Sequence, residues 1–423
     1  MALSIEDFLN LSNLEHGLGP TGSSAMTMLR GLSINKGLLP IPHNTDHQGY
    51  VFFTKPACNL TYNNIKLIPE LNFLADDREN SMSNAIRCML SPNLFGEPDI
   101  KTLSASALKD GKILQRSNLI NDKQAFLPIS NFLESLSAMP DTQMDTYNSP
   151  EGKRGEQITF YDGYSEFNGV YDITATFDNM DGDFICATFG AWIEWGNRYV
   201  EGTVCPFPVF LICNEMDYTS RYYRLIMDKT RTFIQNIAAP GYFIPTTNPD
   251  GAKFGYNRAN VYTDENNKVQ INLHCVGAEK NRNVLMYEFN ETVELFNPDM
   301  KDNKSQMVKL NQSKSEIPYD LKKIFDYEAY PYINLTTYEL EWYVEKEIYD
   351  TKIKEIKRIL SGVDELLKNT SPQNSTGVPA KSQTSGKKVS NGALTSMVQN
   401  STVSSTILTP NIIKPTTDKN NRQ

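Results

Sequence analysis

The sequence is poor in the residues and motifs that common enzymes use. Its 423 residues include four histidines, so few side chains are suited to general base catalysis near neutral pH. The phosphate-binding glycine loop, the GxSxG nucleophile elbow and the HExxH zinc motif are all absent from the sequence. These absences predict a protein that is not an enzyme and that uses neither a cofactor nor a small-molecule substrate.

Two short clusters contain side chains of the metal-ligand type. His43, Asp46 and His47 lie close together, but prolines flank them and a metal-binding helix would not form there. The acidic segment DNMDGD at residues 178–183 lacks the bidentate glutamate that closes an EF-hand loop. We interpret this second cluster as a turn that caps the following helix, and we expect no metal site.

Paired cysteines and apolar runs of membrane-spanning length are also lacking. Six cysteines are scattered without a CxxC pair or a zinc spacing, which predicts reduced core cysteines and folding in a reducing cytosol. The N-terminus, MALSIEDFLNL, carries Glu6 and Asp7 where a signal peptide needs positive charge. We therefore expect neither membrane contact nor export by a signal peptide.

The net charge of −9 is divided unevenly along the chain. Residues 370–423 contain six basic residues and one acid, a charge of +5, so the remainder carries −14, because −14 + 5 = −9. An acidic body has no general attraction for nucleic acid. The last 54 residues include 18 Ser or Thr and no aromatic residue, which predicts a disordered tail. One apolar patch in it, TILTPNIIK, is either a docking peptide or incidental, and its apolar residues are Ile407, Leu408, Ile412 and Ile413.

The strongest periodic signals lie between residues 155 and 296. YDITATF at 171–177 and VQINLHC at 269–275 alternate apolar and polar residues, which is typical of strands with one buried face. ITFY at 158–161 also has strand character. The segments FLIC and YYRLIMD read as further strands, the first only after Pro208. VLMYEF and VELF read as a late pair of strands joined near Asn290.

A helix is predicted between these strands, at DFICATFGAWIEWGN. Asp183 is the expected N-cap of this helix and Gly196 its expected end. Its aromatic side chains are expected to lock the helix onto the sheet, and they are Phe184, Phe189, Trp192 and Trp195. The fold class is therefore α+β, with an antiparallel β-barrel or sandwich core, a flanking helix, a long C-terminal helix and a disordered C-terminal tail.

The rest of the chain gives weaker signals. We expect two strands around a proline in residues 49–68, a helix at SNAIRCML, and a short helix in residues 125–139. From residue 337 the pattern becomes helical, with apolar residues at heptad spacing that either pack on their own chain or mediate self-association. The first residues of this seam are Tyr349, Ile353, Ile356 and Leu360. The predicted divisions are an N-terminal helix and extended arm at 1–48, a mixed α/β region at 49–150, a β domain at 151–300, a helical region at 301–369 and a tail at 370–423.

The order of these elements resembles that of inner-tube proteins of contractile phage tails. The similarity rests on the strand YDITATF, the short acidic turn, the helix ending in WxxW, and the NIAAPGYFIP segment before the strand VQINLHC. It implies a small antiparallel barrel whose subunits join edge to edge into a ring around a channel. The resemblance implies a place in the tail tube, and because the chain is longer than a plain tube subunit, a junction of the tube with the baseplate or neck is favoured. Inter-subunit or channel-facing positions are then expected at Tyr222, Arg224, Pro240 and Tyr242.

The leading hypothesis is therefore a structural protein of a tailed phage virion, with a tube-like domain. It implies self-assembly and assembly with other tail or baseplate proteins in the host cytoplasm, and passage of DNA without specific binding. One alternative is a glycan-binding fibre or adhesin that uses exposed Tyr and Trp as stacking platforms. Another is a hydrolase whose paired carboxylates have no sequence signature.

Overall fold

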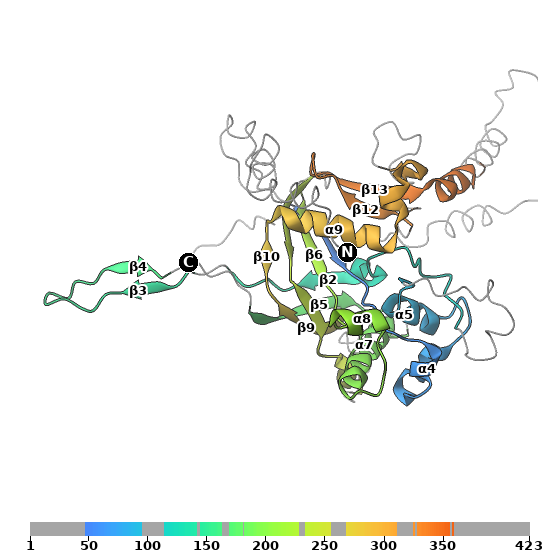
Figure 1. Ribbon diagram of the computed structural model, residues 1–423, viewed down its shortest axis with the longest axis horizontal. Coiled ribbons are helices and arrows are strands. Elements are labelled where there is room, and N and C mark those ends of the chain that lie inside the picture. Colours follow the sequence, from blue (N-terminus) through green and yellow to red (C-terminus); the bar gives the residue numbers. More distant parts are fainter. Residues whose placement is uncertain are drawn as a thin grey trace, which may run out of the picture. The chain divides into compact units, whose positions relative to one another are not determined.

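The structure is a computed structural model of the whole chain. It describes residues 47–94, 114–141, 144–162, 169–180, 182–227, 233–254, 268–310, 325, 328–355 and 358. The chain divides into two units, residues 1–357 and 358–423, and every element named below belongs to the first unit. The architecture is mixed α+β with several antiparallel sheets (Figure 1), as the sequence predicts, but the sheets of the described residues do not close into a barrel.

Sheet A is the antiparallel sheet with strand order β1-β6-β7-β10. In β6 successive side chains point to opposite faces, so that Tyr222 enters one hydrophobic cluster and Tyr223 and Leu225 enter another. A core therefore lies on each face of this sheet. Its strands are β1 (His47–Phe53), β6 (Tyr222–Met227), β7 (Ile234–Ala239) and β10 (Glu279–Lys280).

A glycine is required where β1 begins to pair with β6. The register shifts between His47 and Tyr50, and Gly49 adopts a φ of +64° within this irregular stretch. A Cβ at Gly49 would lie 2.1 Å from the carbonyl oxygen of Leu225. Any side chain here would therefore clash with the partner strand as well as strain the backbone.

Sheet B is the antiparallel sheet with strand order β2-β5-β9-β8. Its centre is a ladder of nine residue pairs between β5 and β9, from Val170↔Val276 to Asp178↔Lys268. Ile173 and Ala175 of β5 are buried beside Ile271 and Leu273 of β9, which confirms the predicted alternation. The strands are β2 (Leu133–Leu136), β5 (Val170–Asp178), β9 (Lys268–Val276) and β8 (Tyr242–Pro245).

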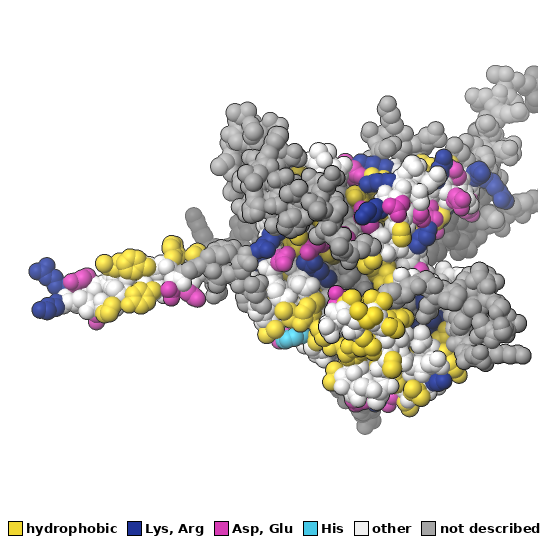
Figure 2. All heavy atoms as spheres, in the orientation of Figure 1, with side chains coloured by type: hydrophobic (Ala, Val, Ile, Leu, Met, Phe, Trp, Pro, Cys, Tyr) yellow, Lys and Arg dark blue, Asp and Glu magenta, His cyan; other side chains and the backbone are white. Residues whose placement is uncertain are grey.

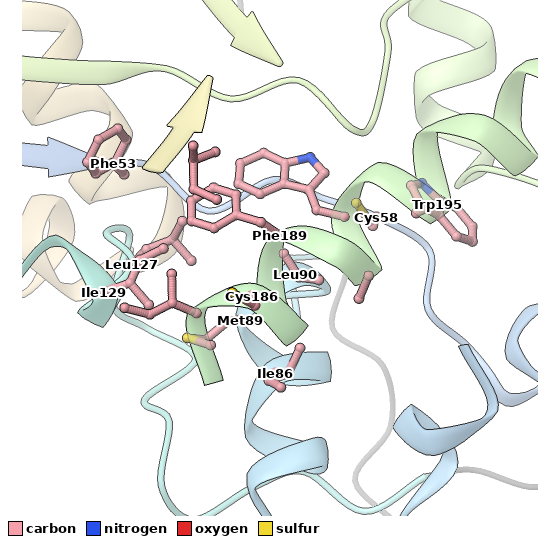
Figure 3. Packing of buried hydrophobic residues seen from close by; sticks show 14 of the residues in the cluster. Phe53, Cys58, Ile86, Met89, Leu90, Leu127, Ile129, Cys186, Phe189 and Trp195 are labelled. Carbon is pink, nitrogen blue, oxygen red and sulfur yellow. The ribbon is translucent and has the colours of Figure 1, made fainter. Parts of the chain in front are cut away.

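The first hydrophobic core lies between sheet A, sheet B and a group of helices. Phe53 of β1 contacts Phe177 of β5 and Phe243 of β8, with ring centroids 6.0 and 5.8 Å apart. Figure 3 shows side chains of α5 and α7 meeting those of β1 and the segment around Leu127 and Ile129 in this core. The helical elements on this side are α4 (Tyr62–Ile65), η1 (Pro69–Ala75), α5 (Met82–Leu90), η3 (Pro128–Phe132), α7 (Phe184–Val200), α8 (Pro208–Cys213) and η4 (Pro249–Phe254).

The second core lies on the other face of sheet A. Phe289 of the helix α9 contacts Phe52 of β1, Phe126 and Tyr223 of β6 at centroid distances of 5.4, 5.0 and 5.2 Å. A third antiparallel sheet, sheet C, with strand order β11-β13-β12, packs in the same cluster. This layer comprises α9 (Asn283–Phe296), α10 (Asp299–Asp302), η6 (Lys304–Gln306), β11 (Met307–Lys309), β12 (Tyr330–Ile333) and β13 (Leu340–Glu345), with residues 346–355 helical.

Several predicted elements are corrected by the structure. The strand pair VLMYEF and VELF is one helix, α9, and FLIC belongs to the helix α8 because Pro208 occupies the first helical turn. The predicted helix in residues 125–139 is a 3₁₀ turn followed by β2, and the second strand expected in residues 49–68 is replaced by α4. Helix α7 continues past Gly196 to Val200, and residues 340–345, expected to be helical, form β13.

Candidate assembly surfaces

Helix α7 turns its aromatic side chains into the first core. Phe189 stacks on Trp192 at 5.9 Å, and Trp192 contacts Phe243 of sheet B at 5.8 Å. Phe184 is 8% exposed and Phe189, Trp192 and Trp195 are 2% exposed or less. Asp183 precedes the helix with a left-handed backbone and makes no side-chain capping hydrogen bond. These aromatic residues therefore position α7 against sheet B and present no surface to a partner.

Both indoles of α7 donate hydrogen bonds to the turn before β6. Trp192 Nε1 donates to the carbonyl oxygen of Tyr218 at 2.6 Å, and Trp195 Nε1 lies 3.2 Å from both carboxylate oxygens of Asp217. Asp217 is fully buried, and burial raises its pKa to about 6 even though the indole and backbone hydrogen bonds favour the ionised form. The segment that connects α8 to β6 is thus held by α7.

This carboxyl group predicts a pH dependence of stability. The pKa of Asp217 is higher in the folded chain than its ordinary value of 3.8, so the folded state binds the proton more tightly than the unfolded state. We expect the contribution of Asp217 to the free energy of unfolding to rise as the pH falls through about 6 and to level off below about 4. The gain is up to about 3 kcal/mol, at 1.36 kcal/mol per pKa unit.

Denaturant unfolding between pH 4 and pH 7.5, followed by tryptophan fluorescence, measures this effect. The Asp217→Asn variant keeps an acceptor for Trp195 but cannot titrate. As the pH falls, the free energy of unfolding of the variant should decrease relative to that of the wild type. A difference between the two proteins that stays constant across this range would contradict the prediction.

Sheet B has one open face, in contrast to sheet A. The face opposite the core carries polar side chains, which bond to one another across β5 and β9: Thr174 Oγ1 donates to Asn272 Oδ1 at 3.1 Å, and His274 Nδ1 lies 2.7 Å from Asp172 Oδ1. Lys268 on the same strand is paired with Glu134 of β2. This face is polar, has its basic side chain neutralised, and ends at two edge strands, β2 and β8.

A two-stranded hairpin, called the arm here, is formed by β3 (Thr146–Asn148) and β4 (Thr159–Tyr161). All six strand residues are exposed, and Figure 1 shows the arm standing apart from the sheets. Tyr147 pairs with Phe160, and these side chains are 53% and 55% exposed, while the neighbouring Ile158 is 60% exposed. An isolated hairpin is at best marginally stable in water. The arm therefore presents an apolar face that the described part of this chain leaves uncovered.

A second apolar surface surrounds α8. This helix has no buried residue, and Leu211 and Ile212 are 58% and 80% exposed. Val209 in the helix and Met216 shortly after it are also exposed, and Figure 2 shows hydrophobic side chains gathered over α8. A six-residue helix is too short to be stabilised by its own hydrogen bonds. Contiguous apolar surface of this kind marks a protein contact.

Of the four residues expected at inter-subunit or channel-facing positions, two are buried and two are half-buried. Tyr222 is fully buried between the two sheets, and Pro240 is buried where the chain crosses from β7 to β8. Arg224 is half-buried and donates to the carbonyl oxygen of Leu225 at 2.7 Å, and burial lowers its pKa. Tyr242 is half-buried on β8. Alternation along β6 places an aromatic side chain on each face of sheet A, and nothing in the sequence indicates that both of these faces are covered.

The heptad seam is only partly described. Tyr349 stacks on Phe325 at 5.7 Å, and Tyr349 and Ile353 pack on a small cluster with Leu310 and Val344. These two residues therefore contact their own chain. The other seam residues and the apolar patch of the tail lie outside the described residues: Ile356, Leu360, Ile407, Leu408, Ile412 and Ile413.

The arm and the α8 surface were missed by reasoning from the sequence. The predicted division between residues 150 and 151 falls within the arm, and the sequence predicts only its second strand, at ITFY. The apolar run of α8 indicated a buried strand. Across the described ranges, no group of three or more His, Cys, Asp or Glu side chains could hold a metal ion, and no described helix is long and apolar enough to cross a membrane.

Comparison with known proteins gives one match to a family and several to solved structures. A family model described as "Putative phage tail tube protein" matches residues 6–359. The anti-feeding prophage cap, a tube terminating cap, is similar at 14% identity over 42% of this chain and 98% of its own, with a TM-score of 0.22. The PVC sheath/tube terminator, from an extracellular contractile injection system in its extended state, is similar at 9% identity over 37% and 86%, with a TM-score of 0.20. No curated protein matches the chain.

Proposed function

Because this chain belongs to the phage tail tube protein family, we propose that it is a virion subunit that assembles with its neighbours into the wall of a tail tube. The observation that carries this proposal is the arm, whose apolar face has no cover in the described part of the chain. A neighbouring subunit supplies that cover in an assembly. The subunit then has no catalytic role, and its partners are other copies and other tail proteins.

Sheet B is the surface we assign to the channel. Both faces of sheet A are covered, one by sheet B and the other by α9 and sheet C, whereas sheet B keeps one open polar face. Asp172 on this face is exposed and Lys268 is paired with Glu134, so the described residues of this face offer phosphate no unpaired lysine or arginine. Such a lining lets DNA pass without binding it.

An edge of sheet B supports ring formation. β2 and β8 are its two outer strands, but the outer side of β8 is partly occupied, because Phe243 exchanges both of its backbone hydrogen bonds there with Ser220. We therefore assign the subunit contact to β2, whose pairing with a strand of the next subunit would continue the sheet around the channel. In this arrangement α9 and sheet C lie on the side of sheet A away from the channel. The subunit belongs either to the tube itself or to its junction with baseplate or neck, and its copy number per virion distinguishes these positions.

Substitution of the arm tests the proposal. Replacing Tyr147 and Phe160 by serine together removes two half-exposed aromatic side chains from one face of the hairpin. Burying each in an interface contributes about 2 kcal/mol, so we expect the critical concentration for assembly to rise roughly 100-fold or more. The folded subunit should keep its melting temperature, because exposed positions contribute little to stability.

Light scattering and electron microscopy of the purified chain measure assembly, and thermal unfolding measures the fold. Thr159→Ser, on the other face of β4, is the matched control and should assemble like the wild type. Unchanged assembly of the double variant would overturn the role of the arm.

A further inference from the structure

Helix α8 is held in its exposed position by the chain on either side of it. Before the helix, the carbonyl oxygen of Cys205 accepts hydrogen bonds from the side chains of Asn59 and Asn64 at 2.8 and 3.0 Å. After the helix, the carbonyl oxygen of Asp217 accepts from the backbone N–H of Ala57 at 3.0 Å, and both indoles of α7 donate to the same turn. No residue of α8 itself is buried. The flanking segments therefore position the helix, and its apolar side chains are left for a contact with a partner.

The apolar face of the arm is similar in size to the surface of α8. Tyr147 lies opposite Phe160, and Ile158 lies on the same face as Phe160 because side chains alternate along a strand. From Ile158 to Phe160 the chain rises about 7 Å. A helix of six residues is about 9 Å long. The three apolar side chains of the arm can therefore lie across Leu211 and Ile212 of one α8.

The turn of the arm carries two adjacent bases. Lys153 and Arg154 are exposed and form no ion pair with the described residues, and Figure 2 shows basic side chains at the outer end of the arm. The acids of the same turn lie against its backbone. Glu156 Oε2 accepts a hydrogen bond from the backbone N–H of Arg154 at 2.9 Å, and Glu151 Oε1 would lie 3.8 Å from a Cβ at Gly155. The two bases are therefore available to a partner.

The C-terminal end of α8 carries the opposite charge. Glu215 is the one charged residue in the sequence between residues 202 and 216, and it follows the helix directly. Its backbone N–H donates to the carbonyl oxygen of Phe210 at 3.0 Å, while its side chain is exposed and in no ion pair with the described residues. Each surface thus has an apolar part with charge at one end. Opposite charges fix the direction in which two such surfaces meet.

We propose that the arm of one subunit docks on α8 of a second copy of this chain, with the turn of the arm beside Glu215. This contact rests on the proposed assembly of the chain with its own copies. Because it joins two different surfaces, each subunit gives one arm and receives another, and repetition of the contact produces a ring or a helical stack. A contact between two arms would instead close as a dimer and leave α8 uncovered.

Disulfide trapping in the full-length chain tests this docking. Cys213 of α8 is exposed and serves as one partner, and Cys205→Ser removes the other exposed cysteine of the described residues. In this background Ile158→Cys places a thiol on the apolar face of the arm, and mild oxidation of the assembled protein should join most chains into covalent multimers. Thr159→Cys is the matched control and should give roughly 10-fold less product, because it lies on the opposite face of the arm.

The nature of the product distinguishes the possible partners. Multimers that disappear when Cys213→Ser is added uphold the proposal. Multimers that persist with Cys213→Ser would show contact between two arms, and an oxidised monomer would show contact with α8 of the same chain, so either result overturns it. Absence of any product also overturns the docking, and tubes that form without it leave the proposed function standing. Dimers linked through Cys213 in a chain that forms no tubes uphold the docking and count against the tube.

Exchange of charge tests the direction of docking. Glu215→Lys places like charges together and should lower the yield of linked multimers about 3-fold, as expected for an exposed ion pair. Adding Lys153→Glu and Arg154→Glu to this variant should restore the yield. A yield that Glu215→Lys leaves unchanged, or that the combined variant does not recover, overturns the placement of the turn of the arm beside Glu215.

Discussion

Replacing Trp195 by alanine is expected to lower the free energy of unfolding by about 5 kcal/mol. Trp195 is fully buried, and its removal leaves a cavity where α7 packs in the first core. The loss also takes the indole donor from Asp217, a buried carboxylate that the indole contacts through both oxygens. An uncompensated buried acceptor adds to the cost of the cavity.

Two further substitutions separate these contributions. Trp195→Phe keeps most of the apolar volume but removes the donor, so it should cost less than half as much as alanine. Val200→Ala, on the same helix, is the control, since Val200 is 77% exposed and should change stability by less than about 0.5 kcal/mol. Denaturant unfolding of the three variants provides the values. A cost below about 1 kcal/mol for Trp195→Ala would show that α7 is not held by this side chain.

The sequence correctly predicted the elements that have one buried face and one solvent-exposed face. β5 and β9 alternate because their polar residues lie on the open face of sheet B and their apolar residues lie in the core. The aromatic spacing of α7 was equally clear, because that helix buries one side and exposes the other. An amphipathic pattern is local, so it can be recognised without knowing which elements pack against the strand or helix.

The secondary structure of elements that are buried on both faces was predicted wrongly, because their sequences do not alternate between apolar and polar residues. β13, Leu340–Glu345, has buried residues on both faces, and without alternation it was interpreted as helix. In α9, the sequence predicts a connection between two strands near Asn290, yet Asn290 is buried and exchanges hydrogen bonds with the backbone of Ile333, both at 2.8 Å. Ile333 is 43 residues from Asn290 in the sequence, and nothing near Asn290 indicates this contact.

The candidate assembly surfaces show the same limit of prediction from sequence, here for apolar residues that are exposed. The arm and α8 expose apolar residues that an isolated subunit would be expected to bury, so a hydrophobic run alone could not tell a core strand from a contact surface. Tyr222 illustrates the reverse case, an aromatic assigned to a surface that lies in the core. The distinction depends on which sheet faces are covered, and that is settled by tertiary packing.

Replacing Lys309 by methionine is expected to destabilise the chain by about 3 kcal/mol at pH 7. Lys309 Nζ donates to Glu341 at 2.8 Å, and Glu341, on the central strand of sheet C, is 4% exposed. Burial opposes ionisation of Glu341, but the hydrogen bonds from Lys309, Tyr343 and Asn334 outweigh it and lower its pKa below the usual range. Without the lysine, a buried carboxylate keeps its charge and loses its counterion.

The pH dependence of this cost identifies its cause. Because the folded pKa of Glu341 is lowered, the stability that it contributes is present above its unfolded pKa of about 4.5 and is lost as the pH falls through the folded value. Losing Lys309 allows burial to raise that pKa, so the penalty of Lys309→Met should be smaller at pH 4.5 than at pH 7. The double variant, in which Glu341→Gln is added to Lys309→Met, should regain most of the lost free energy of unfolding at pH 7. Lys301→Met, at an exposed position of α10, is the control and should change stability by less than about 0.5 kcal/mol. A penalty that is equal at both pH values, or that persists in the double variant, would mean that Lys309 acts through packing and not through the charge of Glu341.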